Sequence, residues 1–225
     1  MSTKLDAIQF PGEFHLQVAK IKTSTGLEID LRKSILGITI FEDLFSSTIS
    51  GTMVVQDAVN LASLGPIIGQ EYLFLKIKTP SLTDLDSKID FSENAFIVFD
   101  ISGREDAGNG VQGYTLSFVS QELIKDQRTK IKQSLTDSWS KIVERILVNK
   151  LETKKKIVIE PTTGVKKFIS PNLRPFELIR LATRQAISRD EGKSMFVFYE
   201  SLKGFNFRSL SSLYNEGSKF SYDDH

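Results

Sequence analysis

The stretch that most limits the possible folds of this chain runs from Ile35 to Asp57, ILGITIFEDLFSSTISGTMVVQD. It predicts two long strands joined by a short polar connection around residues 41–47. In the second strand Ile49, Met53 and Val55 alternate with polar side chains, which is typical of a strand with one buried face. We therefore expect this region to be scaffold rather than active site, in a protein that packs against other chains.

The composition is that of an ordinary globular protein with a substantial core. The chain has 225 residues, of which 40% are hydrophobic and 25% charged. It contains no cysteine, which excludes disulfides, thiolate metal sites and cysteine nucleophiles. The first residues lack the pattern of a signal peptide, and no apolar run approaches the length of a membrane span. The sequence thus predicts a protein that is neither secreted by a signal peptide nor integral to a membrane.

The charge is unevenly distributed along the chain, although its total is only +1. Residues 1–124 have a net charge of −7, residues 125–167 of +7 and residues 168–225 of +1. Such a basic segment can contact nucleic acid, complement an acidic neighbouring subunit, or form solvated lysine-rich faces. The lysines have no interleaved aromatic residues and form no known nucleic-acid motif, which favours the solvated faces.

The first part of the chain, residues 1–124, predicts an antiparallel β domain. Its strand candidates are bounded by Gly, Pro, Asn, Asp or Ser. They cover residues 14–23, 27–31, 35–41, 48–56, 71–78, 95–102 and 114–121. Seven strands with short connections favour a closed or nearly closed small barrel, because closure removes exposed edges.

The second part, residues 125–225, predicts a mixed helical and β domain, so the fold class is α+β. Residues 122–137 are expected to be a linker or a domain boundary, because the alternation is lost there. Helical periodicity begins at Ser138 and again at Pro175, and residues 156–160 and 166–169 are short strand candidates. Residues 195–213 predict a hairpin whose aromatic side chains pair across the strands.

Residues typical of catalysis or ligand binding are sparse. Residues 108–113, GNGVQG, match a dinucleotide-binding pattern, but a strand follows them where that motif needs a helix, so we expect a hairpin loop. Asp84, Asp86 and Asp90 resemble the start of a calcium loop that lacks its glycine and its final glutamate. With only His15 and His225, no triad or zinc site can be assembled. We predict no catalytic residue, no metal and no cofactor.

Three phrases together resemble the baseplate central hub subunit of contractile-tailed, myovirus-type bacteriophages. They are ISGTMVVQDAVNLASLGPIIGQEYLFLKIKTP, SPNLRPFELIRLATRQA and MFVFYESLKGFNFRSLSSL. The resemblance covers residues 14–214. It implies a homotrimer of split-barrel, tudor-like domains in a pseudo-hexameric ring in the virion, assembled in the host cytoplasm. The implied partners are the tail tube protein, the spike or cell-puncturing protein, baseplate wedge proteins and, in transit, DNA.

Residue roles under this resemblance follow from position. The barrel wall or subunit contact would contain Ile38, Ile40, Ile49, Met53 and Val55. Packing of the second domain would involve Phe196, Phe198, Phe205 and Phe207. Hub subunits often have two full barrels and a longer C-terminal part. Either the second barrel here is minimal, or that part is missing and the pseudo-sixfold symmetry is in doubt.

Alternative functions remain open from the sequence. A tail tube or spike protein of a related contractile system is close in kind. A nucleic-acid-binding module would use the basic segment that begins at Lys125 and ends at Lys167. If the chain is a hub, we expect that segment to lie mostly outside the channel or at a subunit contact, because DNA must slide through without binding tightly. A glycan-degrading enzyme is a third alternative.

Overall fold

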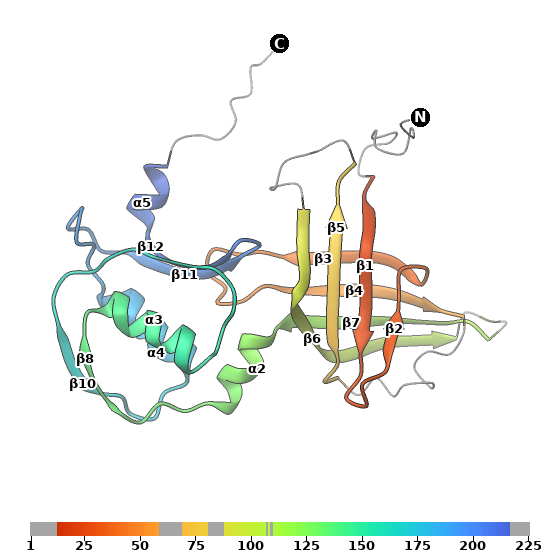
Figure 1. Cartoon of the computed structure of the whole chain (residues 1–225), viewed down its shortest axis with the longest axis horizontal. Helices are drawn as coiled ribbons and strands as arrows, with labels where there is room; N and C mark the ends of the chain where they lie inside the picture. The colour runs from red at the N-terminus through yellow and green to blue at the C-terminus, as the bar shows by residue number, and fades with distance from the viewer. Residues whose placement is uncertain (1–12, 59–68, 81–87, 107, 109, 217–225) are drawn as a thin grey trace, which may run out of the picture. The chain divides into compact units, whose positions relative to one another are not determined.

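The computed structural model describes residues 13–58, 69–80, 88–106, 108 and 110–216 (Figure 1). The chain forms two compact units. The first unit consists of Met1–Phe41 and Ile49–Gln121. The second unit consists of Glu42–Thr48 and Glu122–His225.

The first unit contains one antiparallel sheet of seven described strands. The strands are β1 (His15–Lys22), β2 (Glu28–Asp30), β3 (Ile35–Phe41), β4 (Ser50–Asp57), β5 (Tyr72–Lys78), β6 (Lys88–Asp106) and β7 (Gln112–Ser120). Their order across the sheet is β2-β1-β5-β6-β7-β4-β3. The predicted antiparallel β structure is therefore confirmed.

Strand β6 bends the sheet so that it curls around its own core. The first half of β6 pairs with β5 and the second half with β7, and the pairing with β7 shifts register twice. Register shifts of this kind bend a strand and increase its twist. Figure 1 accordingly shows β1 and β5 running across the direction of β3, β4 and β7. The core inside the curl includes fully buried side chains from both halves: Ile21, Met53, Val55, Leu73, Leu75, Leu116 and Phe118.

The sheet is curled but open among the described residues, where the strand pattern favoured a closed or nearly closed barrel. Its edge strands are β2 and β3, and no pairing among the described residues joins them. Residues 31–34 nevertheless connect β2 directly to β3, so the two edges approach each other at that corner. Backbone bonds hold the connection, from the Leu31 N–H to the Ala19 carbonyl (2.8 Å) and from the Gln56 N–H to the Ser34 carbonyl (2.7 Å). Because β2 is only three residues long, it cannot continue the pairing from there.

Glycines have two different roles in this unit. The segment around Gly108 and Gly110, both with positive φ, joins β6 to β7, as the alternation after it predicted. Gly51 in β4 lies under the ring of Phe118 and beside the carbonyl of Thr39, so a methyl group there would overlap both. Glycine is thus required at position 51 for close packing rather than for its backbone freedom.

The second unit combines helices with two small sheets. Its helices are α2 (Gln121–Arg128), α3 (Trp139–Asn149), α4 (Pro175–Gln185) and α5 (Leu210–Tyr214). Its strands are β8 (Ser134–Asp137), β9 (Ile157–Ile159), β10 (Lys166–Ile169), β11 (Phe196–Ser201) and β12 (Gly204–Ser209). One sheet pairs β10 with β8, and the other has the order β11-β12-β9, with β9 parallel to β12.

Residues 122–137, where a linker or a domain boundary was expected, begin the second unit at Glu122 and contain α2 and β8. They are not an irregular linker, because Glu122 and Asp126 are buried by partners far along the chain, which local patterning does not reveal. The expected second hairpin strand ends at Ser209 instead of Leu213. There the Ser209 hydroxyl accepts a hydrogen bond from the Ser212 N–H (3.1 Å) and caps α5.

The second core gathers around α3 and α4, the two helices that the periodicity from Ser138 and from Pro175 predicted. It contains Trp139, Ile142, Val143, Ile146 and Leu147 from α3, and Phe176, Leu178, Ile179 and Ala182 from α4. The aromatic face of β11 and β12 completes it. None of the described helices combines the length and apolar composition of a membrane span.

Candidate assembly surfaces

The described residues contain no constellation typical of a metal site. Within residues 13–216, apart from the undescribed gaps, no three His, Cys, Asp or Glu side chains lie where they could hold a metal ion together. His15 begins β1, and His225 lies outside the described residues. Asp84 and Asp86 also lie outside them, whereas Asp90 forms an ion pair with Lys76 (2.7 Å).

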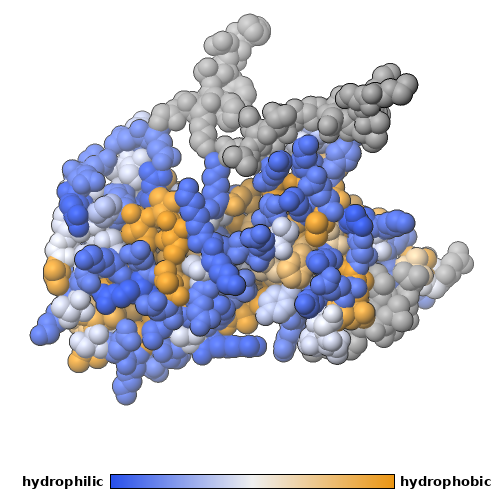
Figure 2. All heavy atoms as spheres, in the orientation of Figure 1, coloured by the Kyte–Doolittle hydropathy of each residue, from blue (hydrophilic) through white to orange (hydrophobic). Residues whose placement is uncertain are grey.

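The β3 edge of the sheet presents apolar side chains to solvent. Leu36 is 67% exposed and Phe41 is 53% exposed, and Val54 on the neighbouring strand β4 is also exposed. Figure 2 shows that apolar side chains form separate patches within a largely hydrophilic surface. An edge strand with exposed apolar residues and no partner is a template for pairing with another chain. The β3 edge is thus the first candidate assembly surface.

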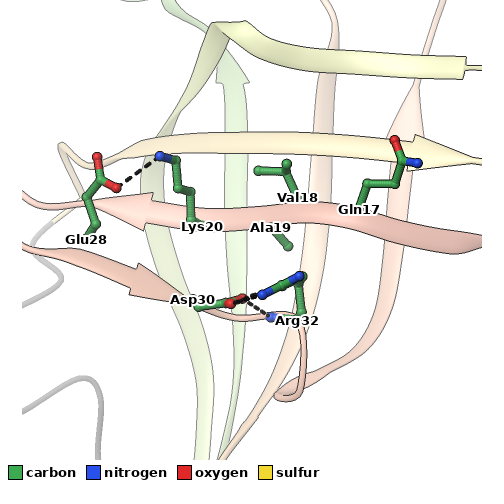
Figure 3. Close-up of a pocket in the computed structure, with 7 residues that line it drawn as sticks. All are labelled: Gln17, Val18, Ala19, Lys20, Glu28, Asp30 and Arg32. Atoms are coloured by element: carbon green, nitrogen blue, oxygen red, sulfur yellow. Dashed lines mark hydrogen bonds and ion pairs between the residues drawn. The ribbon is translucent and has the colours of Figure 1, made fainter.

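The opposite edge is formed by β1 and β2 and has a groove, which Figure 3 shows. The groove has a volume of about 420 Å³ and is lined by Gln17, Val18, Ala19, Lys20, Glu28, Asp30 and Arg32. Register pairs between β1 and β2 involve only the last three residues of β1, so β2 does not cover the first half of that strand. This groove is the second candidate assembly surface.

Two ion pairs neutralise the rim of the groove. Lys20 Nζ lies 2.9 Å from Glu28 Oε2, and Arg32 Nη2 lies 2.6 Å from Asp30 Oδ2. The hydrogen bond and charge of Lys20 lower the pKa of Glu28, and those of Arg32 lower the pKa of Asp30. The charged groups are satisfied within the chain, so an arriving strand would meet a rim without net charge.

The five residues predicted for the barrel wall or subunit contact belong to one cluster. Ile49, Met53 and Val55 are fully buried in the core of the first unit. Ile38 and Ile40 on β3 are partly buried and pack against the same core. Their neighbours Leu36 and Phe41, which sequence reasoning did not select, are the exposed members of the edge. Leu36 lies at a bulge, which interrupts the alternation that predicts the buried face. Phe41 follows the regular alternation after Ile38 and Ile40 and lies on the opposite face.

The four phenylalanines predicted for second-domain packing lie together on one face of β11 and β12. The rings of Phe198 and Phe205 stack with centroids 5.6 Å apart, and those of Phe196 and Phe207 lie 4.9 Å apart. The register places Phe198 directly opposite Phe207. Cross-strand aromatic contacts of this kind fix the register of a hairpin.

A buried ion network in the second unit was missed by sequence reasoning. Lys155 Nζ lies 2.7 Å from Glu122 Oε2 and 2.6 Å from Glu200 Oε1, with all three side chains almost completely buried. The Thr153 hydroxyl donates a further bond to Glu122 Oε1 (2.7 Å). One ammonium between two carboxylates joins α2, the loop before β9 and β11. Its members are far apart in sequence, and Lys155 is hidden in a run of three lysines.

A second buried carboxylate connects α2 to α4. Asp126 Oδ1 accepts a hydrogen bond from the Phe176 N–H (2.7 Å), one of the otherwise unpaired amides at the start of α4. Burial raises the pKa of Asp126, against the lowering effect of that hydrogen bond. This carboxylate and the ion network hold α2 in the second unit, so both serve structure.

Comparison with known proteins gives a likeness of fold. No model of a protein family matches the chain. No curated protein matches it either. Among solved structures, a 43 kDa tail protein of prophage MuSo2 from Shewanella oneidensis has 12% identity and a TM-score of 0.51, with 85% of this chain and 54% of that chain covered.

Two further structures are similar to the same degree. The prophage tail protein gp18 from Listeria monocytogenes has 12% identity and a TM-score of 0.51, with 92% of this chain and 56% of that chain covered. A type VI secretion system component from E. coli, described as structurally similar to the T4 bacteriophage tail proteins gp27 and gp5, has 11% identity and a TM-score of 0.51. Here 87% of this chain and 48% of that chain are covered. The chain thus spans about half the length of these proteins and shares the fold of phage tail proteins and their type VI counterpart.

Proposed function

We propose that this chain is a structural subunit of a phage tail baseplate, acting as a central hub that closes into a ring with copies of itself. The observation that carries the proposal is an open antiparallel sheet with two unlike edges, in a fold shared with phage tail proteins. One edge is apolar and exposed at β3, and the other has a groove beside β1 and β2.

Unlike edges favour a head-to-tail contact between copies. When the β3 edge of one copy extends the sheet of the next at its β1 edge, main-chain hydrogen bonds supply the affinity and no special side chain is needed. A head-to-tail contact produces a closed ring if the rotation per copy closes, and an open filament if it does not. In this proposal the wall of the ring contains the five residues expected there, Ile38, Ile40, Ile49, Met53 and Val55.

The proposed ring contains three copies, each contributing residues 1–124 and 125–225 as separate domains of split-barrel type. It joins the tail tube to the central spike beside the baseplate wedges, and DNA passes through its lumen without covalent chemistry by the chain. The fold likeness to tail proteins supports this role.

Mass photometry and electron microscopy of the purified chain test the proposal. We expect trimers and ring-shaped particles at micromolar concentration. Six copies per ring would assign the chain to the tail tube instead, and a monomer at every concentration up to about 100 µM would refute assembly by the chain itself, since that corresponds to less than roughly 5.5 kcal/mol of association. Steep, salt-sensitive binding of duplex DNA would favour the nucleic-acid module.

Substitutions on the β3 edge test the mode of contact. Leu36→Lys and Phe41→Lys place charges on the exposed edge, which is how natural edge strands prevent pairing. We expect each to weaken assembly at least tenfold. Val165→Lys is the matched control, because Val165 is equally exposed but belongs to a turn of the second unit. Equal weakening by the control would show that any added charge disturbs assembly, and the edge would lose its assigned role.

A further inference from the structure

The three-stranded sheet of the second unit has a second face, opposite its aromatic core, and this face is hollowed. A groove of about 510 Å³ lies over it, lined by Lys156, Val158, Tyr199, Ser201, Lys203, Asn206, Arg208 and Glu216. The register aligns Val158 with Asn206, and Asn206 with Tyr199, in one row across β9, β12 and β11. The floor in the middle of the groove is therefore formed by the apolar side chain of Val158, the amide of Asn206 and the ring of Tyr199.

Cations lie at both ends of this floor. Lys156 and Lys203 lie at the end where β11 turns into β12, and Arg208 lies at the other end. Lys156 and Arg208 are four residues apart along the strand direction, which is about 13 Å at a rise of about 3.3 Å per residue. Glu216, which forms an ion pair with Arg208, is the only carboxylate among the described lining residues. The groove thus has cationic side chains at both ends and already accommodates one carboxylate.

The two units carry opposite net charges. The residues of the first unit sum to −4 and those of the second to +5. Several exposed acids of the first unit are neutralised locally, such as Glu28 by Lys20 and Asp90 by Lys76. The outer half of β6 is different: Asp100 and Glu105 are exposed there and have no ion pair within the described part of the chain.

This outer half of β6, with the start of β7, forms a hairpin whose shape and chemistry match the groove. Asp100 and Glu105 are five residues apart, at most about 16 Å in an extended strand, similar to the spacing of the cationic ends. Phe99, next to Asp100, is 52% exposed and supplies an apolar side chain for the floor. Phe99 is exposed because it occupies the bulge between Val98 and Asp100.

We propose that the groove over β9, β12 and β11 binds the acidic β6–β7 hairpin of a second copy of this chain. Carboxylates of the hairpin pair with Lys156 and Arg208, and Phe99 lies over Val158 and Tyr199. The inference rests on the proposed self-assembly and adds a second, electrostatic contact to the pairing of sheet edges. Charge complementarity of this kind selects the correct partner and its register more than it adds affinity.

A charge-swap experiment tests the proposal in the full chain. The groove variant carries Lys156→Glu and Arg208→Glu, the hairpin variant carries Asp100→Lys and Glu105→Lys, and the swapped variant carries all four. We expect the first two to weaken assembly more than tenfold in mass photometry, and the swapped variant to recover most of the loss. Assembly of the wild-type and swapped chains should also weaken as salt increases, because the contact is ionic.

Each outcome has a separate meaning. Groove and hairpin variants that assemble like the wild type refute the docking contact but leave the proposed ring intact. Loss in both without recovery in the swapped chain shows that the two surfaces do not meet. Binding of a single-stranded oligonucleotide that only the groove variant loses would assign the groove to nucleic acid and overturn the proposal. A wild-type chain that stays monomeric refutes the proposed function itself. Unchanged thermal unfolding of each variant, followed by fluorescence of Trp139, verifies that the second unit is folded.

Discussion

Replacing Lys155 with methionine should cause a large loss of stability in the second unit. Lys155 Nζ bridges Glu122 and Glu200 at 2.7 and 2.6 Å, and all three side chains are buried. Methionine fills a similar volume but removes the only positive charge between two carboxylates. The variant must then keep two carboxylates buried close together without their cation.

The size of the effect follows from that burial. Removing one partner of a buried ion pair costs about 3–5 kcal/mol, because the charge left behind has lost both water and its partner. Against a typical domain stability of about 5–15 kcal/mol, that is a large fraction. With a urea slope of about 2 kcal/mol per molar, the unfolding midpoint should fall by roughly 2 M.

The chain provides its own reporter for this measurement. Trp139 is its single tryptophan and is buried in the core of the second unit, so its fluorescence in a urea titration follows the unfolding of that unit. Lys125→Met is the matched control, since the ion pair of Lys125 with Glu152 (3.3 Å) is partly exposed and worth less than about 1 kcal/mol. Adding Glu200→Gln to Lys155→Met should recover part of the loss by removing one uncompensated carboxylate.

A small effect would refute this reasoning. If Lys155→Met shifts the midpoint no further than Lys125→Met does, the three buried charges do not stabilise the unit as their geometry indicates. If adding Glu200→Gln to Lys155→Met lowers the unfolding midpoint further, repulsion between the two carboxylates is not the cause of the lost stability.

Three further outcomes are expected. Gly51→Ala should destabilise the first unit by about 1–3 kcal/mol in thermal unfolding, because the added methyl overpacks the core, whereas Gly37→Ala, where the space is open, should cost less than about 1 kcal/mol. Gly204→Ala should abolish cooperative unfolding of the second unit, because φ at this position is +124° and the methyl would overlap the carbonyl of Lys156. Asp126→Asn should remove a pH dependence, because burial raises the pKa of Asp126 in the folded chain. The wild type should therefore gain stability relative to the variant as the pH falls towards the ordinary aspartate pKa of 3.8, and the opposite slope in urea titrations would contradict this.

The sequence predicts most strongly those elements whose residues repeat with a clear period. The alternation in β4 and the helical stripes in α3 and α4 each reflect burial of one face, so their positions were predicted correctly. Helix α2 could not be found in this way. Its buried Glu122 and Asp126 are polar, and they are buried because Lys155 and the Phe176 amide meet them in the folded chain.

The candidate surfaces were predictable only in part. The strand β3 was expected, but its exposed residue Leu36 occupies a bulge, where the alternation of residues does not predict which side chains face the core. The open corner between β2 and β3 depends on the length of β2, and short strands have no periodicity to measure. The groove over β9, β12 and β11 depends on a parallel pairing between β9 and β12, which joins segments distant in the sequence.

The membership of residues 42–48 in the second unit has a consequence for biosynthesis. These residues leave the ribosome between β3 and β4, yet they line hollows together with α4 and β11, which are synthesised much later. The strands of the amino-terminal sheet can pair early, whereas residues 42–48 have no packing partners until α4 and β11 have been synthesised. A carboxy-terminal fragment that starts at residue 122 would lack the loop altogether, so separate expression of the two halves should yield a soluble first half and an incomplete second.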